Sequence, residues 1–193
     1  MAKVLTSQQK VRIRQAIFKK ADTFGYSSSG RIDSGRFMDE LVDDAEIGGV
    51  LKQYMSKERV RTYIKDSELN AYAKKIINDA LDTIDQTETI RQIYGIESSI
   101  IQQCTGKDAR VSVSRSTDGR IFVVSGGTVL KWETALRKAL ELIAKETGLT
   151  IDGKTPSICL HLVSTNNSLT VADKKHITTA LSAIGVQAIF CND

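Results

Sequence analysis

The chain has 193 residues, of which 41% are hydrophobic and 26% are charged, and its formal net charge at pH 7 is +4. This composition is that of an ordinary globular protein, of one large domain or two small ones, and excludes a largely disordered chain. Its apolar runs are short, as in residues 121–124, and its N-terminus lacks the apolar stretch of a signal peptide, so we expect no membrane association.

The three cysteines, Cys104, Cys159 and Cys191, are widely spaced and odd in number. A secreted disulfide framework normally has an even and denser set, so we expect free thiols, with Cys159 and Cys191 buried in apolar strands. The two histidines of the chain complete no Cys/His spacing typical of zinc sites. The sequence therefore predicts a cytoplasmic protein that needs no metal and no other cofactor.

Charge along the chain is distributed in three alternating blocks. Residues 1–20 carry a charge of +6, residues 33–46 carry −5, and residues 51–65 carry +4. Such alternation favours an intramolecular or intersubunit fit at least as readily as a nucleic-acid surface.

A first helix is predicted to follow a cap at Thr6 or Ser7 and to end at Gly25, with a loop at residues 26–30. Its apolar stripe is expected to comprise Val11, Ala16, Ile17, Ala21 and Phe24.

A second helix is predicted to begin at Asp33 or Ser34 and to be broken by the glycines at residues 48–49. Its expected buried face comprises Phe37, Leu41, Val42 and Ala45.

The next predicted helix is long, from a cap at Ser56 to Ile84, with a break near residues 66–67. Another is predicted from Thr87 or Glu88 through Ile101, with an interruption at Gly95 as the alternative. Residues 1–105 are therefore expected to form a helical domain.

From residue 110 the apolar period changes from near 3.6 to 2, which predicts strands. Residues 110–115 and 120–124 flank Asp118-Gly119, a dipeptide that favours a two-residue hairpin turn. Thereafter we expect a helix over residues 129–147 with Gly148 as its cap, a turn at residues 150–154, a strand over 157–163, a helix over 170–184 and a strand over 186–191. Residues 106–193 are thus predicted to be a small ββαβαβ mixed sheet covered by helices, which makes the whole chain α+β.

The segment Ser125, Gly126, Gly127 and Thr128 is predicted to be a turn between a strand and a helix. Amide groups at a helix start can hold a phosphate, yet the segment matches neither established glycine-rich phosphate motif. A structural corner is the favoured interpretation, and phosphate binding is the minority one.

Two further polar features lie near the predicted strand over residues 157–163. Residues 164–168 follow its carboxyl end, where open α/β sheets place their sites, although a polar turn is the simpler interpretation. His161 within the strand is expected to be a packed or surface histidine rather than a catalytic one, but sequence distance does not exclude a triad.

Residues 50–65 have the pattern of a short helix, a turn at Ser56 and a basic helix start, which is compatible with helix-turn-helix docking on nucleic acid. The simpler interpretation is a solvated basic face. The candidate nucleic-acid contacts are Arg12, Arg14, Lys19, Lys20, Lys57, Arg59, Arg61 and Lys65.

Three functional hypotheses follow. The favoured one is a DNA- or RNA-associated subunit or adaptor of a larger assembly, which binds nucleic acid, a protein partner or further copies of itself through basic helical surfaces. The second is an enzyme acting on a phosphorylated substrate or nucleic-acid backbone at the edge of the C-terminal sheet. The third is a protein–protein scaffold in which the acidic residues 33–46 cover the basic patch, and the sequence leaves the choice between enzyme and binding module open.

Overall fold

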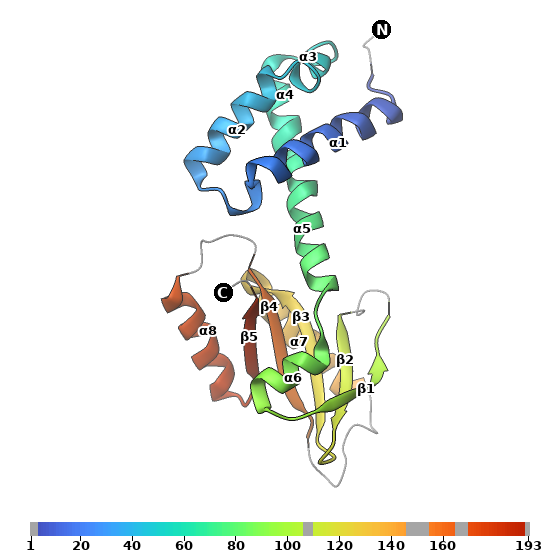
Figure 1. Ribbon diagram of the computed structural model, residues 1–193, viewed down its shortest axis with the longest axis vertical. Coiled ribbons are helices and arrows are strands. Elements are labelled where there is room, and N and C mark those ends of the chain that lie inside the picture. Colours follow the sequence, from blue (N-terminus) through green and yellow to red (C-terminus); the bar gives the residue numbers. More distant parts are fainter. Residues whose placement is uncertain (1–3, 106–109, 146–154, 165–169, 192–193) are drawn as a thin grey trace. The chain divides into compact units, whose positions relative to one another are not determined.

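A computed structural model describes residues 4–105, 110–145, 155–164 and 170–191. Within these ranges a series of helices precedes a five-stranded mixed sheet (Figure 1), so the predicted α+β fold is confirmed. Two compact units are distinguished, Met1–Ile76 and Ile77–Asp193. The sequence placed the boundary after residue 105. The helix Gln86–Tyr94 and the strand Ser98–Gln103 precede this residue, yet they contact the strands of the second unit. No helix in the described ranges is long and apolar enough to span a membrane.

The first unit is built from helices around one apolar core. Its elements in chain order are α1 (Ser7–Phe24), the 3-10 turn η1 (Tyr26–Ser28), α2 (Arg31–Asp43), α3 (Gly48–Leu51), α4 (Lys57–Tyr63), the π-helical segment η2 (Ile64–Leu69) and the start of α5 (Asn70–Asp82).

Helix α1 begins and ends where the sequence predicts. Thr6 forms a capping box with Gln9, and Gly25 ends the helix with a left-handed φ of 70°. The buried stripe, however, is Ile13, Ile17 and Ala21, at a spacing of four residues. The predicted stripe was wrong at Val11, which is 54% exposed, because Val11 lies six residues before Ile17 and therefore on a different face of the helix.

Helix α2 buries Phe37, Leu41 and Val42 as predicted, whereas Ala45 is exposed. The predicted break of the second helix at residues 48–49 was wrong, because α2 already ends at Asp43 and the glycines begin α3. A Cβ atom on Gly48 would lie 1.9 Å from the carbonyl oxygen of Val42. Glycine is needed there because α3 approaches the end of α2 too closely for any side chain.

The predicted long helix from Ser56 contains an irregularity at the expected place, but the chain does not break there. Residues Ile64–Leu69 form a π-helical segment that continues α4 into α5. Ile64 and Leu69 are both buried although they are five residues apart, which is the hydrogen-bonding period of a π-helix. The segment thus keeps both side chains in the core.

The second unit contains α6 (Gln86–Tyr94), β1 (Ser98–Gln103), β2 (Val111–Ser116), β3 (Ile121–Thr128), the 3-10 turn η4 (Val129–Lys131), α7 (Trp132–Lys145), β4 (Ser157–Val163), α8 (Val171–Ala183) and β5 (Gln187–Cys191). The strand order is β1-β2-β3-β4-β5, antiparallel from β1 to β3 and parallel from β3 to β5. The hairpin of β2 and β3 is confirmed, with Gly119 at a φ of 83°.

Strand β1 is the main departure from the predicted elements of this unit. The helix expected through Ile101 ends at Gly95, which adopts a left-handed φ of 68°, and residues 98–103 pair with β2 as an edge strand. Ile100 and Ile101 did not distinguish a helix from a strand, because two adjacent apolar residues are compatible with the sequence period of both.

The two faces of the sheet carry different cores. One face, with Val111, Val123 and Leu160, packs against α7 and α8. On the other face, Phe122, Val124 and Cys159 pack against α6, and Figure 1 shows α6 crossing the sheet on the side opposite α7. The predicted cap at Gly148, the turn at residues 150–154 and residues 165–168 lie outside the described residues.

Candidate functional site

The segment that the sequence predicted as a turn, Ser125, Gly126, Gly127 and Thr128, is not a turn. It forms the second half of β3 and pairs with residues 160–163 of the parallel strand β4. A Cβ on Gly126 would lie 2.9 Å from Ile84, and one on Gly127 would lie 2.7 Å from Ala135. The glycines therefore allow side chains to pack tightly on both faces of the strand, and the minority hypothesis of a phosphate-binding turn loses its structural basis.

Three of the eight candidate nucleic-acid contacts form ion pairs within the first unit. Arg14 binds Glu68, with its Nε 2.7 Å from Oε2, and the Glu68 side chain is only 1% exposed. Lys20 Nζ lies 3.0 Å from Asp44 Oδ2, and Arg61 pairs with Asp39. Two of these acids belong to the block at residues 33–46, so part of the charge alternation is satisfied inside the chain.

These ion pairs shift the pKa of Arg14 and of Asp44. The hydrogen bond with Glu68 raises the pKa of Arg14. Burial alone would raise the pKa of Asp44, but hydrogen bonds from Lys20 and from the backbone N–H groups of Ile47 and Glu46 outweigh burial and lower this pKa. Arg14 and Lys20 are therefore engaged by acids of the first unit.

The other five, Arg12, Lys19, Lys57, Arg59 and Lys65, form no ion pair with an acidic residue in the described ranges. A spacing of four residues places Lys57, Arg61 and Lys65 on one flank of the helix, whereas Arg59 lies on another. The helix does begin at Lys57 after Ser56, as predicted, but α3 before it has only four residues. A helix-turn-helix motif needs a longer first helix than α3, so the structure does not reproduce the predicted motif.

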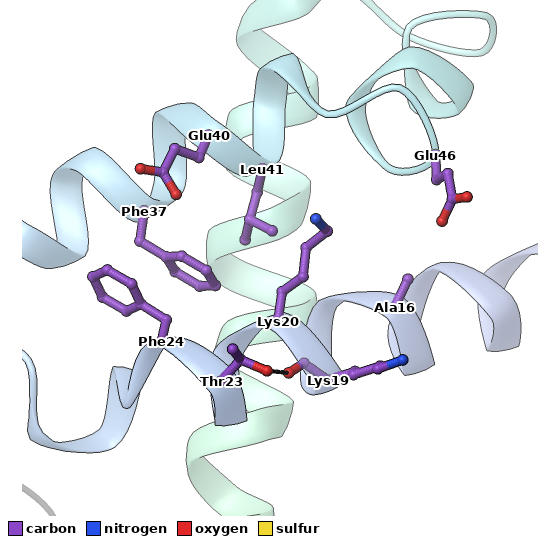
Figure 2. A pocket seen from close by; sticks show the side chains of 9 residues that line it. All are labelled: Ala16, Lys19, Lys20, Thr23, Phe24, Phe37, Glu40, Leu41 and Glu46. Carbon is purple, nitrogen blue, oxygen red and sulfur yellow. Dashed lines mark hydrogen bonds between the residues drawn. The ribbon is translucent and has the colours of Figure 1, made fainter.

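A groove lies between α1 and α2, with a volume of about 620 Å³ (Figure 2). Phe24 and Phe37 close one end of it, with their rings stacked at a centroid distance of 4.5 Å and an interplanar angle of 13°. Ala16 also lines the groove, and Leu41, which is 1% exposed, lies beneath its floor. In Figure 2 the side chain of Lys20 extends from α1 toward α2 across the space between the two helices.

A second cavity of about 460 Å³ extends this groove toward the start of α1. It is lined by Gln9, Arg12, Ile13 and Val50, and it shares Ala16 and Glu46 with the first cavity. The lining residues of α1 thus run from Gln9 to Phe24, which at 1.5 Å per residue corresponds to about 22 Å of helix.

The rims of the groove carry opposite charges. Arg12 and Lys19 line it from α1, whereas Glu40 and Glu46 line it from the other side. Lys20 also lines the groove, but its charge is paired with Asp44. Its apolar floor and two charged rims form a surface for an amphipathic ligand. We call this surface the α1 groove.

A separate polar cluster lies on the α6 face of the sheet. The Thr89 hydroxyl of α6 is 2.8 Å from Nδ1 of His161 in β4, and Nε2 of His161 contacts the Cys191 thiol at the end of β5. Burial lowers the pKa of His161 and raises that of Cys191. In the described part of the chain no group of three or more His, Cys, Asp or Glu side chains is arranged to hold a metal ion.

Sequence reasoning identified only part of these features. It named Arg12, Lys19 and Lys20, and it placed Glu40 and Glu46 in the acidic block at residues 33–46 without locating the groove between them. It did not predict the contact of His161 with Cys191. A sequence signal did exist for the groove, because Arg12, Ala16, Lys19 and Thr23 recur at three or four residues on one flank of α1. No sequence signal pointed to the contact of His161 with Cys191, because this contact depends on how β4 pairs with β5.

Comparison with known proteins gives no relative from which a role could be transferred. No protein-family model matches the chain, and neither a curated protein nor a solved structure matches it significantly.

Proposed function

We propose that this protein is an adaptor whose α1 groove binds an amphipathic helical segment of a partner protein. The observation that carries this proposal is the combination of an apolar floor with rims of opposite charge. A helix with an apolar stripe, acids on one flank and bases on the other complements such a surface.

The length of the groove favours a polypeptide over a small molecule. About 22 Å of α1 matches four turns of a bound helix, and 620 Å³ together with the adjoining 460 Å³ leaves room for a row of side chains. Phe24, at 37% exposed, offers an aromatic surface at one end, and aromatic anchors often carry much of the energy of an interface.

The test uses a synthetic amphipathic peptide of about 18 residues, with a leucine stripe flanked by glutamates on one side and lysines on the other. Ala16→Phe fills the groove where its two cavities meet and is expected to weaken peptide binding at least about ten-fold in a fluorescence anisotropy titration. Gln15→Phe adds the same bulk at an exposed position outside the groove lining and is expected to leave affinity unchanged.

A peptide with its charged flanks exchanged provides the second control and is expected to bind more weakly. The proposal fails if both peptides bind equally, or if Ala16→Phe and Gln15→Phe behave alike. It also fails if Ala16→Phe instead dissociates an oligomer of this chain in sedimentation experiments, because the occupant is then a second copy.

Nucleic-acid association is a second candidate function. It is supported by five basic residues that form no ion pair with an acid in the described ranges, namely Arg12, Lys19, Lys57, Arg59 and Lys65. Binding here would be electrostatic and independent of base sequence, because these side chains lie on different flanks of their helices.

A further inference from the structure

The polar cluster of the second unit combines a thiol, an imidazole and a hydroxyl from three different elements. His161 pairs with Ile189 across the parallel strands β4 and β5, and Val163 pairs with Cys191. His161 and Cys191 therefore project from the same face of the sheet, near the carboxyl ends of the two strands. Such ends of parallel strands are where α/β sheets commonly place their sites.

The hydrogen bonds of the cluster determine which nitrogen of His161 carries the proton. The Thr89 hydroxyl donates its single hydrogen to the backbone carbonyl of Asp85, at 2.8 Å. Thr89 Oγ1 must then accept from His161 Nδ1, at 2.8 Å, so Nδ1 carries the hydrogen. The lone pair of Nε2 is thereby directed at the Cys191 thiol, which donates to it.

Burial differs along this chain of hydrogen bonds. Thr89 is completely buried and His161 is 8% exposed, whereas Cys191 is only half-buried. The base and the group that orients it are thus shielded from water, whereas Cys191 keeps part of its surface exposed. This is the order of nucleophile, base and orienting group found in enzymes that use an activated cysteine.

We propose that Cys191 is a nucleophilic thiol with His161 as its general base and Thr89 as a positioning residue, and that its substrate is a small disulfide. In the reaction, Cys191 Sγ attacks one sulfur of the disulfide while its proton moves to His161 Nε2. A new S–S bond forms, the S–S bond of the substrate breaks, and the departing thiolate takes the proton from His161. The products are a mixed disulfide on Cys191 and one free small thiol.

Disulfide exchange fits this cluster because it needs only a nucleophilic sulfur and a group that shuttles one proton. Burial lowers the pKa of His161 and raises that of Cys191, so both groups are neutral at pH 7. The proton is therefore transferred during the attack, and a preformed thiolate is not required.

The test follows the rate of mixed-disulfide formation on each cysteine of the full chain with glutathione disulfide, measured by mass spectrometry of the digested protein. Cys191 is expected to react at least about ten-fold faster than Cys104, which is also half-buried and provides an internal reference. His161→Gln is expected to reduce the Cys191 rate to that of Cys104 and to leave the Cys104 rate unchanged.

Two variants of Thr89 separate positioning from simple packing. Thr89→Val keeps the shape but removes the hydroxyl, and it is expected to slow Cys191 several-fold. Thr89→Ser keeps the hydroxyl and is expected to preserve the rate at Cys191. The comparison of the valine and serine variants tests the proposal even if His161→Gln does not fold. Equal rates at Cys191 and Cys104 in the wild-type protein, or equal effects of valine and serine at position 89, would falsify the proposal.

Discussion

At the scale of single residues, two glycines of the first unit illustrate why the surroundings, and not the residue type, decide the role of a glycine. Gly35 lies inside α2 with no heavy atom within 4 Å of a Cβ built on it, whereas the same atom on Gly48 would overlap the backbone of Val42. Gly35 therefore only weakens its helix, while Gly48 makes the junction of α2 and α3 possible.

These two positions give a matched pair of substitutions. Gly35→Ala is expected to increase the free energy of unfolding by about 0.5–1 kcal/mol, because alanine loses less backbone entropy in a helix. Gly48→Ala is expected to decrease it by at least about 2 kcal/mol, because the backbone must move to admit the methyl group. Urea titration followed by far-ultraviolet circular dichroism measures both, and a stabilising Gly48→Ala would contradict the close approach.

At the scale of elements, ion pairs help to determine how helices of the first unit pack. Lys20 on α1 binds Asp44 at the end of α2, and Asp44 also accepts backbone hydrogen bonds from Glu46 and Ile47. The Lys52–Asp43 pair is longer, at 3.4 Å, and Asp43 is 69% exposed. The first pair is therefore expected to stabilise the fold more than the second.

The Asp44 contact predicts a pH dependence of stability. The pKa of Asp44 is lower in the folded chain, so its contribution is present above the unfolded-state pKa of about 4 and is lost as the pH falls through the folded-state value. Asp44→Asn is expected to cost about 1 kcal/mol at pH 7 and progressively less below pH of about 4.

Urea titrations of both proteins across this pH range measure the difference. Asp43→Asn serves as the control and is expected to have an effect close to zero at every pH. A cost of Asp44→Asn that stays constant down to the acid limit would show that the charge of Asp44 does not contribute.

At the scale of the whole molecule, the chain separates its candidate functions between two units with separate cores. The α1 groove and the unpaired basic residues belong to the first unit, and the Cys191 cluster belongs to the second. The net charge of +4 is moderate, and part of the basic charge is neutralised by neighbouring acids. Any nucleic-acid surface would therefore be confined to the few basic side chains that form no ion pair in the described ranges.

Salt dependence tests for such a local surface. If Lys57 and Lys65 contact phosphates, neutralising both to glutamine is expected to reduce the slope of log affinity against log salt by about two for a duplex DNA. Lys131→Gln, at an exposed position of the second unit that is not among the candidate contacts, is expected to leave the slope unchanged. Affinity that does not vary with salt, measured by fluorescence anisotropy, would exclude electrostatic binding by this helix.

The sequence by itself determined most elements, because their signals are local. Thr6 and Gly25 delimit α1, Asp118-Gly119 turns the hairpin, and Thr170 caps α8, each through contacts within a few residues. Such signals were misleading where glycines allow two elements to pack closely, as at residues 48–49 and 126–127, which the sequence predicted as a break and a turn.

Only the tertiary structure decided which side chains meet. The opposite rims of the α1 groove come from separate helices, and Thr89, His161 and Cys191 come from α6, β4 and β5. A chemical site of this kind depends on distances between segments far apart in the chain. Local propensity carries no information about those distances, whereas helix packing and strand register determine them.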